Sequence, residues 1–122
     1  MLTITRQFEF EAAHKLPNHE GKCKNLHGHS YKLQITMSGS IQNFGPGAGM
    51  IMDFGQLKKI VQVYVIESLD HMYLNDILEV PTAEELVLWI VGRLTGVIVH
   101  PQLECVRLYE TSNSYAEWRR EK

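Results

Sequence analysis

The 122-residue sequence lacks the features that mark several large classes of protein. It has no excess of positive charge, since 12 lysines and arginines stand against 14 aspartates and glutamates. This balance argues against a protein that neutralises a run of nucleic-acid phosphates. Its longest uninterrupted apolar run, from Leu86 to Val91, has six residues, whereas a membrane-spanning helix needs about 20. The two cysteines, Cys23 and Cys105, are too few for a disulfide scaffold.

The N-terminus also lacks the apolar stretch of a secretory signal peptide, because its first residues alternate between polar and apolar. What is present is ordinary for a folded chain: 44% of the residues are apolar and 21% are charged. The length suits one domain. These observations predict a soluble protein with one domain, residues 1–122, in the reducing cytoplasm, with neither a nucleic acid nor a membrane as its partner.

Four segments have the alternation or composition of β-strands with one buried face. Residues 2–12 and 27–38 alternate between apolar and polar side chains, and the loop between them carries proline, asparagine and glycine. We expect these two strands to pair antiparallel. Two further strands are predicted at 104–110 and 114–119, on either side of a Thr-Ser-Asn turn.

Two amphipathic helices are predicted between these hairpins. Asp53 with Gln56, and Thr82 with Glu85, have the spacing of N-terminal capping boxes, and a loop at 70–81 separates the helices. Their apolar stripes are Leu57, Ile60, Val61, Tyr64 and Val65 in the first helix and Leu86, Trp89, Ile90, Leu94 and Val97 in the second. The order ββααββ predicts an α+β fold, in which two helices cover one face of a four-stranded antiparallel sheet. The other sheet face then needs cover, which predicts an oligomer.

Three of the six histidines are predicted to leave the same face of the first hairpin. His27 and His29 are two residues apart in one strand, which places their side chains about 6.5–7 Å apart on one side. His14 shares the parity of the apolar residues in the facing strand. Three histidines could each be packed and hydrogen-bonded, but burying three together without a shared partner is costly. The pattern therefore favours a metal, and three imidazoles with an open position are typical of catalytic zinc.

The residues alone leave the roles of three other groups open. Cys23 could be a fourth ligand that closes a structural zinc site, or a free thiolate that acts as a base near the metal. Glu110 shares the parity of an apolar strand face and needs a partner there, which could be a ligand or an arginine. The Asp70–His71 pair could equally be a histidine that a helix C-terminus favours.

Six motifs together identify a resemblance that covers essentially the whole chain. They are Phe-Glu-Ala-Ala-His at 10–14, Cys-x-x-x-His-Gly-His at 23–29, Met-Asp-Phe at 52–54, Leu-Asp-His-x-x-Leu-Asn at 69–75, Pro-Thr-Ala-Glu at 81–84 and Tyr-Glu-Thr at 109–111. In this order they resemble the 6-pyruvoyl-tetrahydropterin synthase family. The short length is most similar to the bacterial members of the family that act in queuosine biosynthesis.

The resemblance implies a tunnelling fold, in which three ββααββ subunits form a twelve-stranded barrel and two such trimers stack as a homohexamer. It also implies a Zn²⁺ cofactor. The site residues that it carries over are the metal ligands His14, His27 and His29, the catalytic residues Cys23, Asp70, His71 and Glu110, and the substrate-binding residues Thr82, Ala83, Glu84 and again Glu110. In this scheme Cys23 is the general base, Asp70 and His71 relay protons, and Glu110 anchors a pterin ring.

The implied activity is a zinc-dependent carbon–carbon lyase. It converts 7,8-dihydroneopterin triphosphate to 6-carboxy-tetrahydropterin and releases acetaldehyde and triphosphate. The same residues serve an elimination of triphosphate that keeps the three-carbon side chain, so this reaction is the first alternative. A cyclohydrolase or a pterin aldolase of the same fold is more distant. A non-catalytic structural zinc protein, with Cys23 as a ligand, is the alternative from another class.

Overall fold

The structure is a computed structural model that describes every residue from Met1 to Lys122. Its helices and strands, in chain order, are β1 (Thr3–His14), β2 (His27–Ser38), α1 (Phe54–Val61), α2 (Glu67–Leu69), β3 (Met72–Tyr73), α3 (Ala83–Thr95), β4 (Gln102–Thr111) and β5 (Ser114–Arg119). Three tighter or wider turns complete the list, at Lys22–Lys24 (3₁₀), Gln62–Ile66 (π) and Leu74–Asp76 (3₁₀). None of the helices has both the length and the apolar character needed to cross a membrane.

The strands form one sheet in the order β3-β1-β2-β4-β5. The four long strands pair antiparallel, as the sequence predicts. The fifth strand corrects the prediction of a loop at 70–81 and of a purely antiparallel sheet, because Met72–Tyr73 pairs parallel with Ala12 and Ala13 of β1. Two residues are too few to show an alternation, so a strand this short leaves no periodic signal in the sequence.

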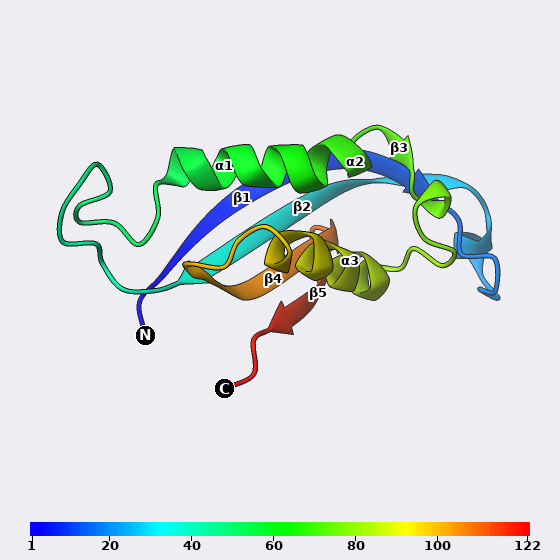
Figure 1. The fold of residues 1–122 in the computed structure, drawn as a ribbon. Helices are drawn as coiled ribbons and strands as arrows, with labels where there is room; N and C mark the ends of the chain where they lie inside the picture. Colours follow the sequence, from blue (N-terminus) through cyan, green and yellow to red (C-terminus); the bar gives the residue numbers. More distant parts are fainter.

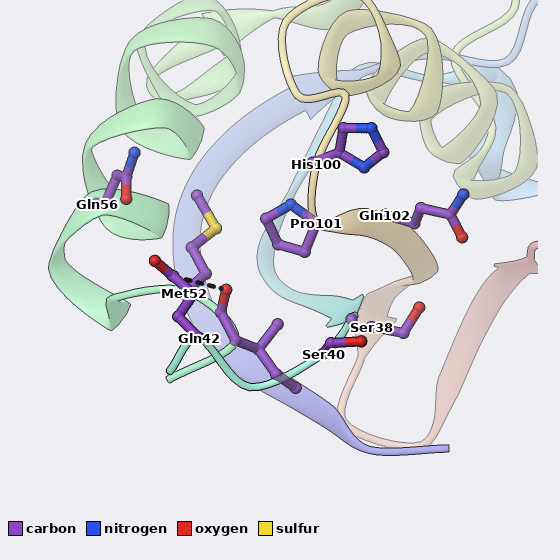
Figure 2. Close-up of a pocket in the computed structure, with 10 residues that line it drawn as sticks. Ser38, Ser40, Gln42, Met52, Gln56, His100, Pro101 and Gln102 are labelled. Carbon is purple, nitrogen blue, oxygen red and sulfur yellow. Dashed lines mark hydrogen bonds between the residues drawn. The ribbon is translucent and has the colours of Figure 1, made fainter. Parts of the chain in front are cut away.

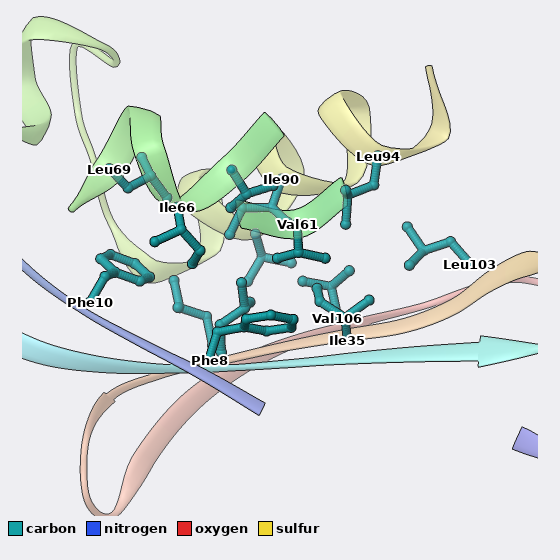
Figure 3. Close-up of a cluster of buried hydrophobic side chains, with 14 of the residues drawn as sticks. Phe8, Phe10, Ile35, Val61, Ile66, Leu69, Ile90, Leu94, Leu103 and Val106 are labelled. Carbon is teal, nitrogen blue, oxygen red and sulfur yellow. The ribbon is translucent and has the colours of Figure 1, made fainter. Parts of the chain in front are cut away.

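The helices cover one face of this sheet, which confirms the predicted α+β architecture (Figure 1). Figure 3 shows the core between the two layers, where Phe8, Phe10 and Ile35 of the strands meet Val61 and Ile90 of the helices. This core has 23 buried apolar residues. The opposite face of β1 carries exposed polar residues and no helix. Cover of that face by other subunits stays a prediction.

Both predicted helix starts are confirmed. The Asp53 side chain accepts a hydrogen bond from the Gln56 N–H at 3.1 Å, and the Thr82 hydroxyl oxygen accepts one from the Glu85 N–H at 3.2 Å. Each bond satisfies one of the free N–H groups of a first helical turn. The N-terminus of α3 is thereby fixed next to Pro81, whose carbonyl oxygen contacts His14.

The stripe predicted for the first helix was wrong in one place. Tyr64 is 39% exposed, whereas Ile66 and Leu69 are buried. The cause is the π turn at Gln62–Ile66, because a turn with i→i+5 bonds rotates all following side chains away from the 3.6-residue period.

Candidate functional site

The hairpin of β1 and β2 brings three imidazoles together at one end of the sheet. The register places His14 opposite His27 and Ala12 opposite His29. One ring nitrogen from each histidine lies within 4.8 Å of the other two, so that the three can hold a metal ion. The three pairs of ring centroids are 4.6, 5.1 and 4.9 Å apart. This geometry confirms that the three predicted histidines meet on one face.

Two backbone carbonyls determine which nitrogens of the cluster are free. His14 Nδ1 lies 2.8 Å from the Pro81 oxygen, and His27 Nδ1 lies 2.7 Å from the Asn25 oxygen. A carbonyl oxygen only accepts, so Nδ1 carries the hydrogen in both rings. In the neutral rings each Nε2 then has only a lone pair. These two Nε2 atoms are 3.0 Å apart, so they face each other with no hydrogen between them.

His29 adds a third free nitrogen. Its Nε2 is buried and has no hydrogen-bond partner, the only such side-chain atom in the structure. Burial is the main reason why the pKa of His29 is lowered, and this favours the neutral ring that binds metals. Three converging ring nitrogens, two of them with lone pairs fixed by Nδ1–H bonds to carbonyls, are the donor set and outer-shell arrangement of a three-histidine metal site. The residues present therefore fit a metal ion such as zinc.

Tyr31 packs below the cluster and was missed in the sequence as part of the site. Its side chain is 1% exposed, and its ring packs edge-on against His29 with centroids 5.6 Å apart. Its hydroxyl oxygen lies 3.5 Å from His14 Nδ1. Burial, followed by the nearby Glu110 carboxylate, raises the pKa of Tyr31. The available signal was its position two residues after His29, on the same strand face.

Glu110 lies beside the cluster at the end of β4. Its Oε1 is 3.6 Å from His29 Nε2, too far for a good hydrogen bond. The sequence left an arginine as the alternative partner, but the two that lie near Glu110 in the sequence, Arg107 and Arg119, instead bind Glu117 at 2.6 and 2.8 Å. The structure thus leaves the Glu110 carboxylate free of arginine at the edge of the histidine site.

Asp70 and His71 form the pair that the sequence suggested, at the end of α2. Asp70 Oδ1 is 3.0 Å from His71 Nδ1 and also accepts the Glu11 N–H at 3.0 Å. The Glu11 bond is the largest cause that lowers the pKa of Asp70. His71 has φ of 60°, which is uncommon for a residue with a side chain, and its own N–H donates to the Glu11 oxygen at 2.6 Å.

The ring of His71 points outward. The His71 side chain is 78% exposed, and since Nδ1 faces Asp70, its Nε2 is the nitrogen left for another group. A cavity of about 450 Å³ is lined by both His29 and His71, together with Glu11, Ser30 and Tyr73. The structure therefore brings the outward histidine and one member of the cluster to the same hollow.

The remaining predicted residues lie at the same end of the molecule. Thr82, Ala83 and Glu84 begin α3 immediately after Pro81, whose carbonyl holds His14. Cys23 lies half-buried in the 3₁₀ turn between β1 and β2, and its carbonyl accepts the Leu16 N–H at 2.7 Å. Cys23 does not line the cavity shared by His29 and His71.

A second hollow lies at the far end of the sheet. It has a volume of about 610 Å³ and is lined by polar side chains such as Ser38, Gln42 and Gln102 (Figure 2). His100 also lines it, but the structure groups no three histidine, cysteine or carboxylate side chains there that could hold a metal. The chemistry that the sequence indicated is thus confined to the histidine end.

Comparison with known proteins agrees with the motifs. The sequence pattern of the family described as 6-pyruvoyl tetrahydropterin synthase matches residues 3–121. The chain belongs to this family. A solved structure of 6-pyruvoyl tetrahydropterin synthase from Caenorhabditis elegans is similar in fold, with a TM-score of 0.85 and 28% identity over 98% of this chain and 96% of that one. The tunnelling-fold subunit expected from the sequence is thereby confirmed.

Two curated relatives differ in the reaction that their names give. A 6-carboxy-5,6,7,8-tetrahydropterin synthase from Synechocystis sp. is 44% identical over 121 residues, which cover 97% of this chain and 93% of the relative. A dihydroneopterin monophosphate aldolase from Pyrococcus furiosus is 40% identical over 91 residues, 75% of this chain and 73% of the relative. The family is therefore established, and the names of these relatives give more than one reaction for it.

Proposed function

We propose that the chain is a zinc-dependent 6-carboxy-5,6,7,8-tetrahydropterin synthase, a carbon–carbon lyase of queuosine biosynthesis in the cytoplasm. Its substrate is 7,8-dihydroneopterin triphosphate, and its products are 6-carboxy-tetrahydropterin, acetaldehyde and triphosphate. The nearly full-length similarity to the Synechocystis protein of that name supports this reaction. The observation that carries the metal is the pair of Nε2 atoms of His14 and His27, 3.0 Å apart with both Nδ1 atoms bonded to carbonyls.

His14, His27 and His29 are the proposed ligands. When bound, zinc supplies a Lewis acid that stabilises negative charge developing on the oxygens of a substrate side chain. The protein's contribution is to keep the three nitrogens aimed at one point before the metal arrives. The bonds to Pro81 and Asn25 fix the orientation of two rings, and burial lowers the pKa of His29, which favours the neutral form of the third ring.

Cys23 is the proposed general base, which removes a proton from a side-chain carbon of the substrate. Asp70 holds His71 through Nδ1, so His71 Nε2 is the atom that donates or accepts a proton. The outward direction of that ring supports the proposal that His71 serves a site completed by a neighbouring chain. We propose that this neighbour belongs to a homohexamer made of two trimers.

Glu110 is the proposed anchor of the pterin ring. A carboxylate free of arginine can accept hydrogen bonds from a ring N–H and an exocyclic amino group. Its position 3.6 Å from His29 would place the bound ring next to the metal ligands. Thr82, Ala83 and Glu84, at the start of α3, are proposed as a second contact to the same ring.

A product assay tests the reaction. Zinc-loaded protein is incubated with freshly made 7,8-dihydroneopterin triphosphate, and acetaldehyde and the pterin mass are measured. The proposal predicts acetaldehyde with a 6-carboxy product. A product that keeps the three-carbon chain would instead assign the triphosphate elimination, and cleavage of dihydroneopterin monophosphate would assign the aldolase reaction of the Pyrococcus relative.

A structural zinc site is the candidate from another class, and metal removal separates it from a catalytic one. If the chain loses turnover but keeps its fold when a chelator strips the metal, the site is catalytic. If it unfolds, and if no pterin is turned over by the loaded protein, the site is structural.

A further inference from the structure

The side chain of Asn75 makes two hydrogen bonds to a single backbone residue. Its Oδ1 accepts the Lys15 N–H at 3.0 Å, and its Nδ2 donates to the Lys15 carbonyl oxygen at 2.8 Å. A carboxamide that bonds both groups of one residue takes the place of a neighbouring strand. These bonds therefore extend the pairing of β1 beyond its last residue, with a partner 60 positions away in the sequence.

Lys15 connects this clamp to the loop that carries Cys23. The next residue, Leu16, donates its N–H to the Cys23 carbonyl oxygen at 2.7 Å. The path from Asn75 to Cys23 is thus two hydrogen bonds to Lys15, one peptide unit, and one further hydrogen bond. No other side chain bonds to the backbone of Lys15 or Leu16.

Asn75 has a firm base from which to hold that loop. It lies in the 3₁₀ turn that follows β3, and the preceding residue, Leu74, is completely buried. The turn is closed by the Ile77 N–H, which donates to the Leu74 oxygen at 3.0 Å. The two residues before this turn, Met72–Tyr73, pair with β1. The carboxamide is therefore carried by a segment that is packed into the core.

The metal ligands are held by other contacts. His14 is fixed by its bond to the Pro81 oxygen and by strand pairing with His27. His27 is fixed by its bond to the Asn25 oxygen, where the loop meets β2. Loss of the Asn75 side chain would release Lys15 and the loop as far as Cys23, but it would leave these contacts of the histidine rings in place. The clamp thus acts on the part of the loop that carries the thiol.

We propose that Asn75 is a positioning residue, which holds the Cys23 loop in place beside the histidine cluster. Its effect on turnover rests on the proposed function, in which Cys23 is the general base. Its effect on the loop itself is independent of that function, so the two can fail separately.

The test compares Asn75→Ala and Asn75→Asp with the wild-type chain, each loaded with zinc. Asn75→Ala removes both bonds, whereas Asn75→Asp keeps the acceptor for the Lys15 N–H and loses the donor. In Asn75→Ala, alkylation of Cys23 by iodoacetamide and hydrogen exchange of the Leu16 N–H should both become about tenfold faster, the equivalent of roughly one net hydrogen bond. Asn75→Asp should lie between, and it decides the matter if the alanine variant does not fold.

Peptide mass spectrometry separates Cys23 from Cys105, which is buried. Gln42→Ala is the matched control, because Gln42 also bonds a backbone carbonyl, that of Ile51 at 3.4 Å, but in the loop at the other end of the sheet. This control should leave both rates unchanged. Zinc affinity should stay within about twofold of wild type in all three variants.

In the pterin assay, Asn75→Ala should lower kcat about tenfold with KM unchanged, and Asn75→Asp should restore part of kcat. Unchanged alkylation and exchange in both Asn75 variants would overturn the proposal. A fall in zinc affinity that accompanies faster alkylation and exchange would also overturn it, because Asn75 would then act on the histidines. If the wild-type chain turns over no pterin, the proposed function fails, and the alkylation and exchange rates still decide the role of the clamp.

Discussion

Buried polar side chains gather at both ends of β2, around His27 at one end and around Ser38 at the other. At the Ser38 end the carboxylate of Glu104 accepts the Ser38 hydroxyl at 2.9 Å and binds Arg120 at 3.0 Å and Lys122 at 2.9 Å. At the histidine end, by contrast, two Nε2 atoms face each other and His29 Nε2 has no partner. The two ends are about 36 Å apart along the strand.

The difference separates a cluster whose polar groups are all paired from one whose ring nitrogens are left without a partner. Every charge near Glu104 has an opposite charge or a hydroxyl against it, so the cluster needs nothing from outside and ties the C-terminal residues to the sheet. Unsatisfied lone pairs in a buried site destabilise a fold unless a ligand completes them. The histidine end is therefore the end at which we expect a ligand, the proposed metal ion, to bind.

Removing one histidine should produce the largest effect. His29→Ala takes away one of the three proposed ligands, and we expect zinc affinity to fall by at least about a hundredfold and turnover to disappear. Competition with a chromophoric chelator measures the affinity. Glu104→Gln, at the Ser38 end, should bind zinc as the wild type does. Equal losses in the two variants would erase the distinction between the ends.

Removing the thiol should affect turnover and not the metal. Cys23→Ala is expected to lower kcat by about 10²–10⁴, the usual contribution of a general base, at unchanged zinc affinity. Steady-state kinetics and a zinc titration of the same sample check this. A collapse of zinc affinity would make Cys23 a ligand and the site a closed, structural one.

Neutralising Glu104, at the Ser38 end, should affect the stability of the fold and its pH dependence. Hydrogen bonds from Lys122 first, then Ser38 and Arg120, lower the pKa of Glu104 to about 2 from an ordinary 4.5. Its contribution is thus full above pH 4.5 and is lost as the pH falls through 2. Glu104→Gln should lower Tm by roughly a few degrees at pH 7, and the difference should vanish below about pH 2. Thermal unfolding across pH measures it, and a difference that persists at the acidic end would contradict this cause.

The smallest effect is expected from Tyr31, whose ring packs against His29. Tyr31→Phe keeps the ring that packs against His29 and removes only an oxygen 3.5 Å from His14 Nδ1. Because His14 keeps its bond to Pro81, we expect zinc affinity to fall less than about tenfold. A larger loss would mean that the hydroxyl, and not the carbonyl, orients the ring.

Much of the fold could be predicted from local patterns. The alternation in the long strands and the caps at Asp53 and Thr82 are properties of a few neighbouring residues, and the structure confirms them. The two-residue strand Met72–Tyr73 and the π turn at Gln62–Ile66 could not be predicted in this way. The strand exists only through its pairing with β1, and the turn interrupts the period on which the prediction depends.

The histidine cluster followed from strand parity alone, since His14, His27 and His29 share one face. The tautomer of His14 did not, because it depends on the carbonyl of Pro81, 67 positions away. The Asn75 clamp could not be predicted for the same reason, since its partner Lys15 is 60 positions away in the sequence. Roles for Cys23, Asp70, His71, Glu110 and Thr82–Glu84 came from the family motifs and stay predictions.

We expect the histidine end to be an open metal site, completed by three nitrogens. X-ray absorption at the zinc edge of the zinc-loaded chain identifies the atoms that bind the metal. We expect one zinc per chain with three nitrogen ligands at about 2.0–2.1 Å, one oxygen, and no sulfur. A sulfur ligand at about 2.3 Å, or a chain that takes up no zinc, would contradict it.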